Sequence, residues 1–262
     1  MIKDKIYSDN DWKGIIPHSP PGYEKNKHNV VFDQHSHSIF SDGALTIKQN
    51  VEWHIAMGYN ALAITDHNNM RHLEKIDKVR SEYAERGIII LSGIEWTTDR
   101  IHLNFLGISN WEHKIAYKTT NDKIIDAINK AKEAGAIIVC NHIPWSLYEY
   151  NMKDHPSRET LLDWGIDFIE VINDDSLPEN VYDRDSYEFC NQHKNEVGMI
   201  TGTDMHAPDK LVGGGVRGWT LMNLNELTEE ALIEELRKKR TEIIYSKTPY
   251  LDPGIHRYKI QG

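Results

Sequence analysis

Cysteine is nearly absent from this chain of 262 residues, and long apolar runs are missing. The two cysteines, Cys140 and Cys190, provide no disulfide framework and lack the spacing of a zinc-binding pair. The longest apolar run, residues 87–94, has the length of a buried strand and falls short of the roughly 18 to 20 residues of a membrane span. Residues 1–14 are charged and contain no apolar signal core. We therefore expect a cytoplasmic protein that is not embedded in a membrane.

A basic face is also missing from the sequence. The formal net charge is −10, and the densest basic cluster is the run RKKR at residues 237–240. These four residues end a predicted helix, where cations suit the helix dipole. A protein that tracks along nucleic acid normally presents a basic stripe to the phosphates. We therefore expect no binding to a long nucleic-acid strand.

Strand-like and helix-like segments alternate from residue 30 onwards. Residues 1–29 are polar and are interrupted by PHSPPG at 17–22, so we predict an N-terminal extension over 1–29 and one domain over 30–262. Strands are predicted at 30–33, 61–65, 88–96, 101–108, 136–142, 168–173, 197–204 and 218–224, and helices at 46–57, 71–85, 122–134, 181–194 and 228–240. Several strands are nearly continuous runs of Ile, Val and Leu, which is typical of a parallel sheet covered on both faces. The fold class is therefore α/β, as a β/α barrel or a doubly wound sheet.

Histidines and acidic residues stand at the ends of these strands. His35 and His37 are two residues apart after the first strand, and Asp204 and His206 repeat this spacing after the seventh. Residues i and i+2 of a strand point to the same side, so each pair projects in one direction. Asp42 follows in the loop after the first strand, and four further candidates belong to other strands. His67, Glu95 and His142 lie at the ends of the second, third and fifth strands, and His102 lies near the start of the fourth. In a barrel, the carboxyl ends of the strands form the active-site face.

Glu95 is the most informative of these residues because it lies in an apolar strand. A buried carboxylate is costly unless it is paired or bound to a metal. Imidazoles and carboxylates gathered on one face suit divalent transition metals such as zinc, manganese or iron. The sequence therefore predicts a site for two to three such metals.

This set of motifs resembles the PHP superfamily, the polymerase and histidinol phosphatase phosphoesterases. The shared motifs, over about residues 30–245, are HxH at His35 and His37, SDG at Asp42, TDH at His67, the glutamate Glu95, the single histidines His102 and His142, and DxH at Asp204 and His206. The resemblance implies a distorted (β/α)7 barrel with three metals. It implies a first metal on His35, His37, Glu95 and Asp204, a second on Glu95, His102 and His142, and a third on Asp42, His67 and His206. Two features depart from the family pattern: the extension over 1–29, and Ile143, which stands between His142 and Pro144 where relatives commonly read His-Pro.

The resemblance also implies hydrolysis of a small phosphomonoester, for which a nucleotide is one candidate. Hydroxide from a water that bridges two metals would attack the phosphorus. Glu95 and Asp204 would act in catalysis through these metals, and Asp66 would either orient an imidazole or the water or cap a loop. The predicted substrate-binding residues are Arg71, Arg100, Lys210 and Arg217, the last two flanking the glycine-rich run 212–216, and Trp145, which with Tyr148 could stack on a base.

Other functions are compatible with the same motifs. They are a 5′–3′ exonuclease on short oligonucleotides, a histidinol-phosphate phosphatase, and a metal-binding barrel without catalysis. Many histidinol phosphatases carry histidine where this chain has Asp42, and decayed sites tend to lose ligands. The amidohydrolase barrel also begins with HxH, but it usually needs a bridging lysine or an equivalent carboxylate on a middle strand. The run AIIVCNH at 136–142 offers no lysine.

Overall fold

The computed structural model describes residues 20, 23–111, 118–208, 218–246 and 257–260. Within these ranges, one sheet has the strand order β10-β9-β8-β1-β2-β3-β4-β5-β6-β7. The strands are β1 Val30–Asp33, β2 Ala61–Ile64, β3 Ile89–Thr97, β4 His102–Leu106, β5 Ile137–Cys140, β6 Phe168–Asn173, β7 Gly198–Gly202, β8 Gly218–Met222, β9 Glu242–Ser246 and β10 Arg257–Ile260. The helices are α1 Ile47–Ala56, α2 Leu73–Ala84, α3 Asn121–Glu133, α4 Arg158–Asp163, α5 Arg184–Gln192 and α6 Glu229–Arg237, with a π-helical turn η1 Trp145–Glu149.

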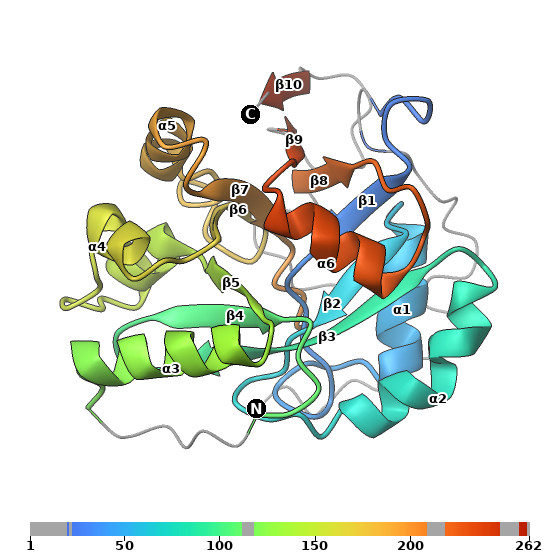
Figure 1. Ribbon diagram of the computed structural model, residues 1–262, viewed down its shortest axis with the longest axis horizontal. Coiled ribbons are helices and arrows are strands. Elements are labelled where there is room, and N and C mark those ends of the chain that lie inside the picture. The colour runs from blue at the N-terminus through green and yellow to red at the C-terminus, as the bar shows by residue number, and fades with distance from the viewer. Residues whose placement is uncertain (1–19, 21–22, 112–117, 209–217, 247–256, 261–262) are drawn as a thin grey trace.

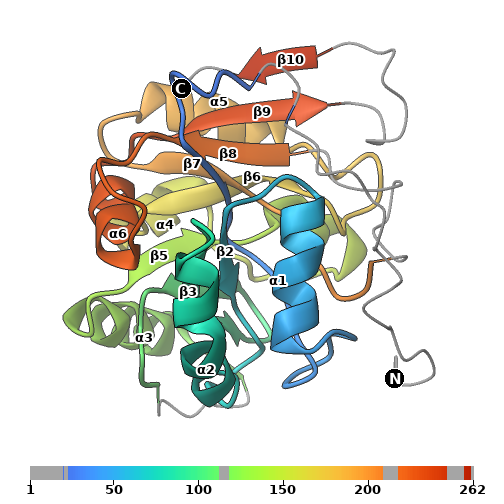
Figure 2. The same cartoon turned by 90° about the vertical axis from the view of Figure 1, so that its right-hand side faces the viewer.

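The sheet curls into a nearly closed barrel with the helices on its outside (Figures 1 and 2). The wall runs from β8 through β1 to β7, and β7 then returns to β8. There the N–H of Thr201 donates to Thr220 Oγ1 at 3.0 Å, and the two hydroxyl oxygens are also 3.0 Å apart. β9 and β10 extend the sheet beyond β8. The predicted distorted barrel is therefore confirmed.

Not every strand runs in the direction that the apolar runs suggest. The pairs β1–β2, β2–β3, β5–β6 and β6–β7 are parallel, whereas β4 is antiparallel to both neighbours and β8 is antiparallel to β1 and β9. Residues 98–101, between β3 and β4, are too few for the crossover that a parallel pair needs. Because β4 is reversed, its first residue, His102, lies at the same edge of the sheet as the last residues of its neighbours β3 and β5.

The interior of the barrel changes from apolar to polar along the strands. Alternate side chains form one apolar cluster at one end: Val30, Phe32, Ala61, Ala63, Ile89, Leu91, Leu106, Ile137, Val139, Phe168, Ile200 and Met222. Leu232 and Leu236 of α6 pack against this cluster and close that end. The next buried layer is polar and contains Gln34, Asn104, Asn141 and Glu170. Since alternate residues of a strand share a face, the inward positions that follow include Glu95 on β3 and His102 on β4.

Local signals set the helix ends. Thr46 forms a capping box with Gln49 at the start of α1, and Thr228 caps α6 by accepting from the Ala231 N–H. The predicted helix at 181–194 begins later, at Arg184, because Asp183 is its N-cap. The sequence analysis missed α4, η1, β9 and β10. Among the described helices, none is long and apolar enough to cross a membrane.

Candidate metal centre

The structure brings all nine predicted ligands together at one end of the barrel. Their donor atoms form four overlapping groups, in each of which all donors lie within 4.8 Å of one another. The groups are His35, His37 and Glu95; His35, His142 and Asp204; Glu95, His102 and His142; and His37, Asp42, His67 and His206. The predicted strand-end face therefore exists, and its residues are close enough to share metals.

The deepest donors surround one point. Nε2 of His35 and Nε2 of His37 are 3.2 Å apart, and Asp204 Oδ1 lies 3.2 and 3.0 Å from them. Glu95 completes the set, with Oε1 3.5 Å from His35 Nε2 and Oε2 3.4 Å from His37 Nε2. Tetrahedral ligands that each lie about 2.1 Å from a zinc ion are about 3.4 Å from one another. This donor set fits one transition-metal ion.

Glu95 also faces a second set of donors. Its Oε1 lies 3.1 Å from His102 Nδ1 and 3.1 Å from His142 Nε2. Asp204 Oδ2 is 3.9 Å from the same His142 nitrogen. One carboxylate can therefore serve two neighbouring ions, which is the bridging position that the resemblance implies.

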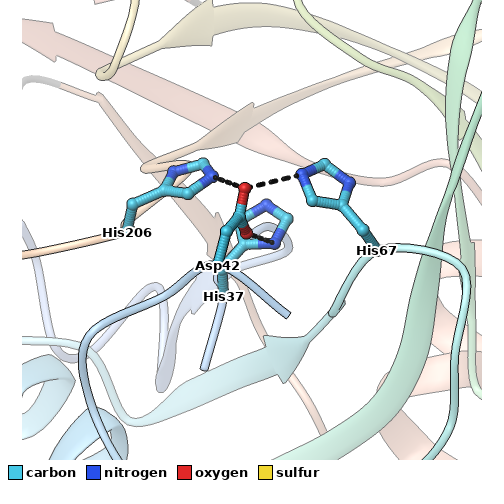
Figure 3. A group of neighbouring side chains, drawn as sticks. All are labelled: His37, Asp42, His67 and His206. Carbon is cyan, nitrogen blue, oxygen red and sulfur yellow. Dashed lines mark ion pairs between the residues drawn. The ribbon is translucent and has the colours of Figure 1, made fainter. Parts of the chain in front are cut away.

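The third set consists of His37, Asp42, His67 and His206 (Figure 3). Asp42 Oδ2 is 3.4 Å from His67 Nε2 and 3.4 Å from His206 Nε2, and Asp42 Oδ1 is 3.7 Å from His37 Nδ1. The Asp42 side chain is 52% exposed, whereas those of His35 and His37 are fully buried. The mouth of the centre is therefore on the Asp42 side.

Two buried oxygens support the fit of the site to cations. Glu95 Oε2 and Asp204 Oδ1 are buried, and their near neighbours include imidazole nitrogens: His67 Nδ1 lies 2.8 Å from Glu95 Oε2, and His37 Nε2 lies 3.0 Å from Asp204 Oδ1. An imidazole satisfies such a buried oxygen only when that nitrogen carries a proton, and a bound cation would serve in its place. Burial alone would raise the pKa of Glu95, but His67, His35 and His102 hold this pKa well below its usual range. Burial, together with His206 and His67, lowers the pKa of His37 to about 4. Ionised carboxylates and neutral imidazoles are the forms that bind metal. Burial alone would lower the pKa values of His35, His67 and His206, but the neighbouring carboxylates raise them, so a metal that binds here would displace protons from these imidazoles.

Two of the predicted ligands have strained backbones. The φ angle is 51° at Asp204 and 26° at His142, a region that non-glycine residues rarely occupy. These conformations turn the chain sharply where β7 and β5 end and allow the side chains to face inward. Strain of this kind is concentrated at functional sites, where the surroundings enforce it.

The comparison with known families agrees with this geometry, because residues 33–206 match the PHP domain. The chain belongs to the PHP family. Its curated relatives include the 5′-3′ exoribonuclease Rnm of Salmonella typhimurium, which is 30% identical over 115 residues. That alignment covers 42% of this chain and 36% of the relative, so the PHP domain described here corresponds to only part of that protein.

Solved structures share the fold of the PHP domain. A two-domain protein from Bacteroides vulgatus, containing a predicted PHP-like metal-dependent phosphoesterase, has a TM-score of 0.65 and 24% identity, over 87% of this chain and 67% of that one. An amidohydrolase from Chromobacterium violaceum, with sulfate bound and no metal, has a TM-score of 0.52 and 19% identity, over 79% of this chain and 96% of that one.

Glu170 of β6 supports the PHP metal centre without being one of its predicted ligands. Its Oε1 accepts from His35 Nδ1 at 3.1 Å and from Gln34 Nε2 at 2.7 Å. Its Oε2 accepts from the His142 N–H at 2.8 Å and from Asn173 Nδ2 at 3.0 Å. With a proton on Nδ1, His35 presents the lone pair of Nε2 to the metal position. The sequence analysis missed Glu170, although its place in the apolar run FIEVIN is the same signal that identified Glu95.

A directed chain of amides connects Glu170 to Glu95. Gln34 Nε2 donates to Glu170, Asn104 Nδ2 donates to Gln34 Oε1 at 2.7 Å, and Asn141 Nδ2 donates both to Asn104 Oδ1 at 2.9 Å and to Glu95 Oε1 at 3.2 Å. Each amide has one allowed orientation because each end of the chain is an acceptor. This network positions the carboxylate that the two inner donor sets share.

Asp66 organises the loop that carries Asp42. Its carboxylate accepts from the Ser38 N–H at 2.8 Å and from the hydroxyls of Ser38 and Ser41, each at 2.6 Å, and it pairs with His72 at 3.0 Å. These are the contacts of the loop-cap alternative. A direct part for Asp66 in catalysis stays a prediction.

The predicted substrate-binding residues do not share one environment. Arg71 donates to the Phe40 carbonyl and to Asn69, whereas Arg100 donates to the carbonyls of Asp154 and Thr119. Trp145 lies beside the second donor set, with its ring centroid 4.8 Å from that of His142. Lys210, Arg217 and the glycine-rich run 212–216 lie outside the described residues. The substrate-binding roles of these residues stay predictions.

A separate cavity of about 680 Å³ lies at the opposite end of the barrel. Residues of both charge signs line it, including Lys194, Lys239, Glu235 and Glu242. Its lining includes none of the candidate metal-binding groups found in the described residues. The cavity and the candidate metal centre are therefore separate places in the described structure.

Proposed function

We propose that this PHP domain hydrolyses small phosphomonoesters, with nucleotides as candidate substrates and two to three divalent transition metals as cofactors. The observation that carries the proposal is the convergence of all nine donor residues, in four overlapping groups of which two share Glu95, at one end of the barrel. Metals bound there would lower the pKa of a coordinated water and polarise the phosphoryl oxygens.

The protein's own residues would prepare this reaction. Glu95 and Asp204 supply the buried negative charge, and Glu170 fixes the orientation of His35. Because Asp42 is the exposed member of the donor set, the phosphoryl group would enter on its side. The amide chain behind Glu95 keeps the site rigid, so little reorganisation is needed during reaction.

The charge distribution favours a small substrate. The chain has a net charge of −10, and the guanidinium groups of Arg71 and Arg100 already bind backbone carbonyls. Affinity for phosphate would then come mainly from the metals. Such a site suits one or two phosphates at a time.

A turnover screen tests the proposal. Protein purified without chelator would be analysed for metals and assayed on a chromogenic phosphate ester and a panel of phosphorylated metabolites, with Zn, Mn and Fe each added back. We expect two to three metal equivalents and turnover. His37→Ala should lose both, whereas the control His193→Ala should keep both, since His193 lies at the end of α5 and pairs with Glu196. Bound metals without turnover on any ester would favour the non-catalytic barrel, and activity without metal would exclude the metal centre.

The second candidate is a 5′–3′ exonuclease on short oligonucleotides. The partial similarity to the Rnm exoribonuclease favours it. The same metal centre would serve both reactions, so the length of the preferred substrate decides between them.

A further inference from the structure

Exposed hydrophobic side chains gather around the mouth of the metal centre. In the described part of the chain, the large hydrophobic residues that are exposed are Ile39, Tyr148, Tyr150, Leu177 and Leu227. The first four lie on loops that follow β1, β5 and β6, at the metal-binding end of the barrel. Leu227 alone lies elsewhere, just before α6. Apolar surface concentrated beside a catalytic centre favours an apolar ligand group there.

The aromatic rings on the loop after β5 form a continuous series. The Trp145 centroid is 4.8 Å from that of His142 and 5.4 Å from that of His102. Tyr150 stacks on Trp145 at 5.1 Å with an angle of 20° between the rings, and Tyr150 is 62% exposed. The series therefore leads from two candidate metal ligands to the solvent.

This loop is held in place by its own hydrogen bonds. The Tyr150 N–H donates to the Trp145 carbonyl at 2.9 Å across the π-helical turn. Glu149 Oε1 accepts from the Leu177 N–H at 3.0 Å and from Asn180 Nδ2 at 2.7 Å. The loops after β5 and β6 are thereby joined. A rigid aromatic surface binds a flat ring with little loss of conformational entropy.

The geometry points to a binding shelf, formed by Trp145 and Tyr150, for a flat ring in the leaving group of the substrate. The chemical class is a phosphomonoester of a nucleoside or another ring-bearing alcohol. The phosphoryl group would lie at the metals while the ring packs against the shelf. This inference rests on the proposed phosphoesterase function, and it adds the part of the substrate that the metals do not contact. Stacking tolerates any base, because every base has a π face.

The decisive comparison is between adenosine 5′-monophosphate and ribose 5-phosphate, which differ only in the base. With the metal-loaded full chain, we expect kcat/KM for the nucleotide to exceed that for the sugar phosphate by about tenfold or more, the size of one stacked base. Trp145→Ala and Tyr150→Ala should reduce this ratio towards one, mainly through a higher KM for the nucleotide. Trp145→Phe and Tyr150→Phe should keep most of the preference, and Leu227→Ala should keep all of it.

A binding measurement separates this inference from the proposed function. Adenosine, which has no phosphate, should bind the wild-type protein in calorimetry and should bind Tyr150→Ala about tenfold more weakly. Tyr150 is mostly exposed, so its replacement leaves the core intact, and unchanged metal content would confirm this. If the wild type and every variant turn over both substrates equally, or if the variants of Trp145 and Tyr150 bind adenosine as tightly as the wild type, the binding shelf is refuted and the proposed function is not affected. Absence of turnover on all phosphomonoesters overturns the proposed function, whatever adenosine does.

Discussion

Replacing Glu170 by glutamine would measure how strongly β6 controls the metal centre. The side chain keeps its size, but one acceptor oxygen becomes an NH2 donor. Each oxygen of Glu170 accepts two hydrogen bonds, from His35 and Gln34 on one side and from the His142 N–H and Asn173 on the other. In either orientation of the new amide, two buried donors lose their acceptor and face a third donor.

The structure sets the expected magnitude. A buried donor left unsatisfied costs about 1–3 kcal/mol, so two cost about 2–6 kcal/mol of the free energy of unfolding. Gln34 cannot escape by turning its amide, because its Oε1 already accepts from Asn104 at 2.7 Å. Since Glu170 orients His35, metal affinity should also fall by about 10- to 100-fold, which is about 1.4 to 2.7 kcal/mol.

Chelator competition and chemical denaturation of the metal-free protein would give the two quantities separately. Glu242→Gln is the control, because Glu242 is a largely buried carboxylate that pairs with His28 at 3.0 Å at the far end of the barrel. The control should lose stability and keep its metal affinity. If Glu170→Gln bound metal as tightly as wild type and lost no more stability than the control, the positioning role would be refuted.

Three other predictions concern charge and substrate size. Glu95→Gln should lose at least one metal and about a hundredfold or more in kcat, measured by elemental analysis and steady-state kinetics; wild-type values for both would exclude the bridging role. The kcat/KM for nucleoside monophosphates should match or exceed that for a 5′-phosphorylated oligonucleotide of ~20 residues. Between ~50 and ~200 mM salt, kcat/KM should fall only as much as about one or two phosphate contacts require. A strong preference for the oligonucleotide that is lost at high salt would favour the exonuclease. Burial would raise the pKa of Asp66, but His72, Ser38 and Ser41 lower it to about 2. The ionised Asp66 carboxylate therefore stabilises the folded state fully above about pH 4, and this stabilisation is lost as the pH falls towards 2. In metal-free Asp66→Asn, the free energy of unfolding should therefore change less with pH between about 2 and 4 than in the wild type. An unchanged slope would contradict the lowered pKa of Asp66.

The sequence predicted which histidines and acids gather at the strand ends because their spacing follows strand geometry. His35 and His37 share a direction in any extended segment, and the same holds for Asp204 and His206. The α/β class followed from the alternation of strands and helices, and the choice of a barrel over a doubly wound sheet came from the resemblance to the PHP superfamily. The direction of β4 did not follow from the apolar run at 101–108, since an antiparallel strand buried on both faces has the same composition as a parallel one.

Other features depended on contacts between distant residues. Glu170 and Asn173 contact the predicted ligands His35, His142 and Asp204, which follow β1, β5 and β7. Their importance therefore emerges only when these strands meet. The apolar run at Glu242–Ser246 is short and was missed as β9. The carbonyl partners of Arg71 and Arg100 are set by loop conformation, which a sequence pattern does not fix.

The division of the barrel interior into an apolar and a polar half has a consequence for local unfolding. The apolar half, closed by Leu232 and Leu236 of α6, holds no candidate metal ligand and can keep its packing without metal. The polar half contains buried carboxylates whose charges are balanced by imidazoles and, in the loaded protein, by cations. In native-state hydrogen exchange, the effect of metal on amide protection should therefore differ between the polar and the apolar half of each strand. Chelation should speed amide exchange in the loops that carry His35, His142 and Asp204, while protection in the apolar half stays close to that of the metal-loaded protein.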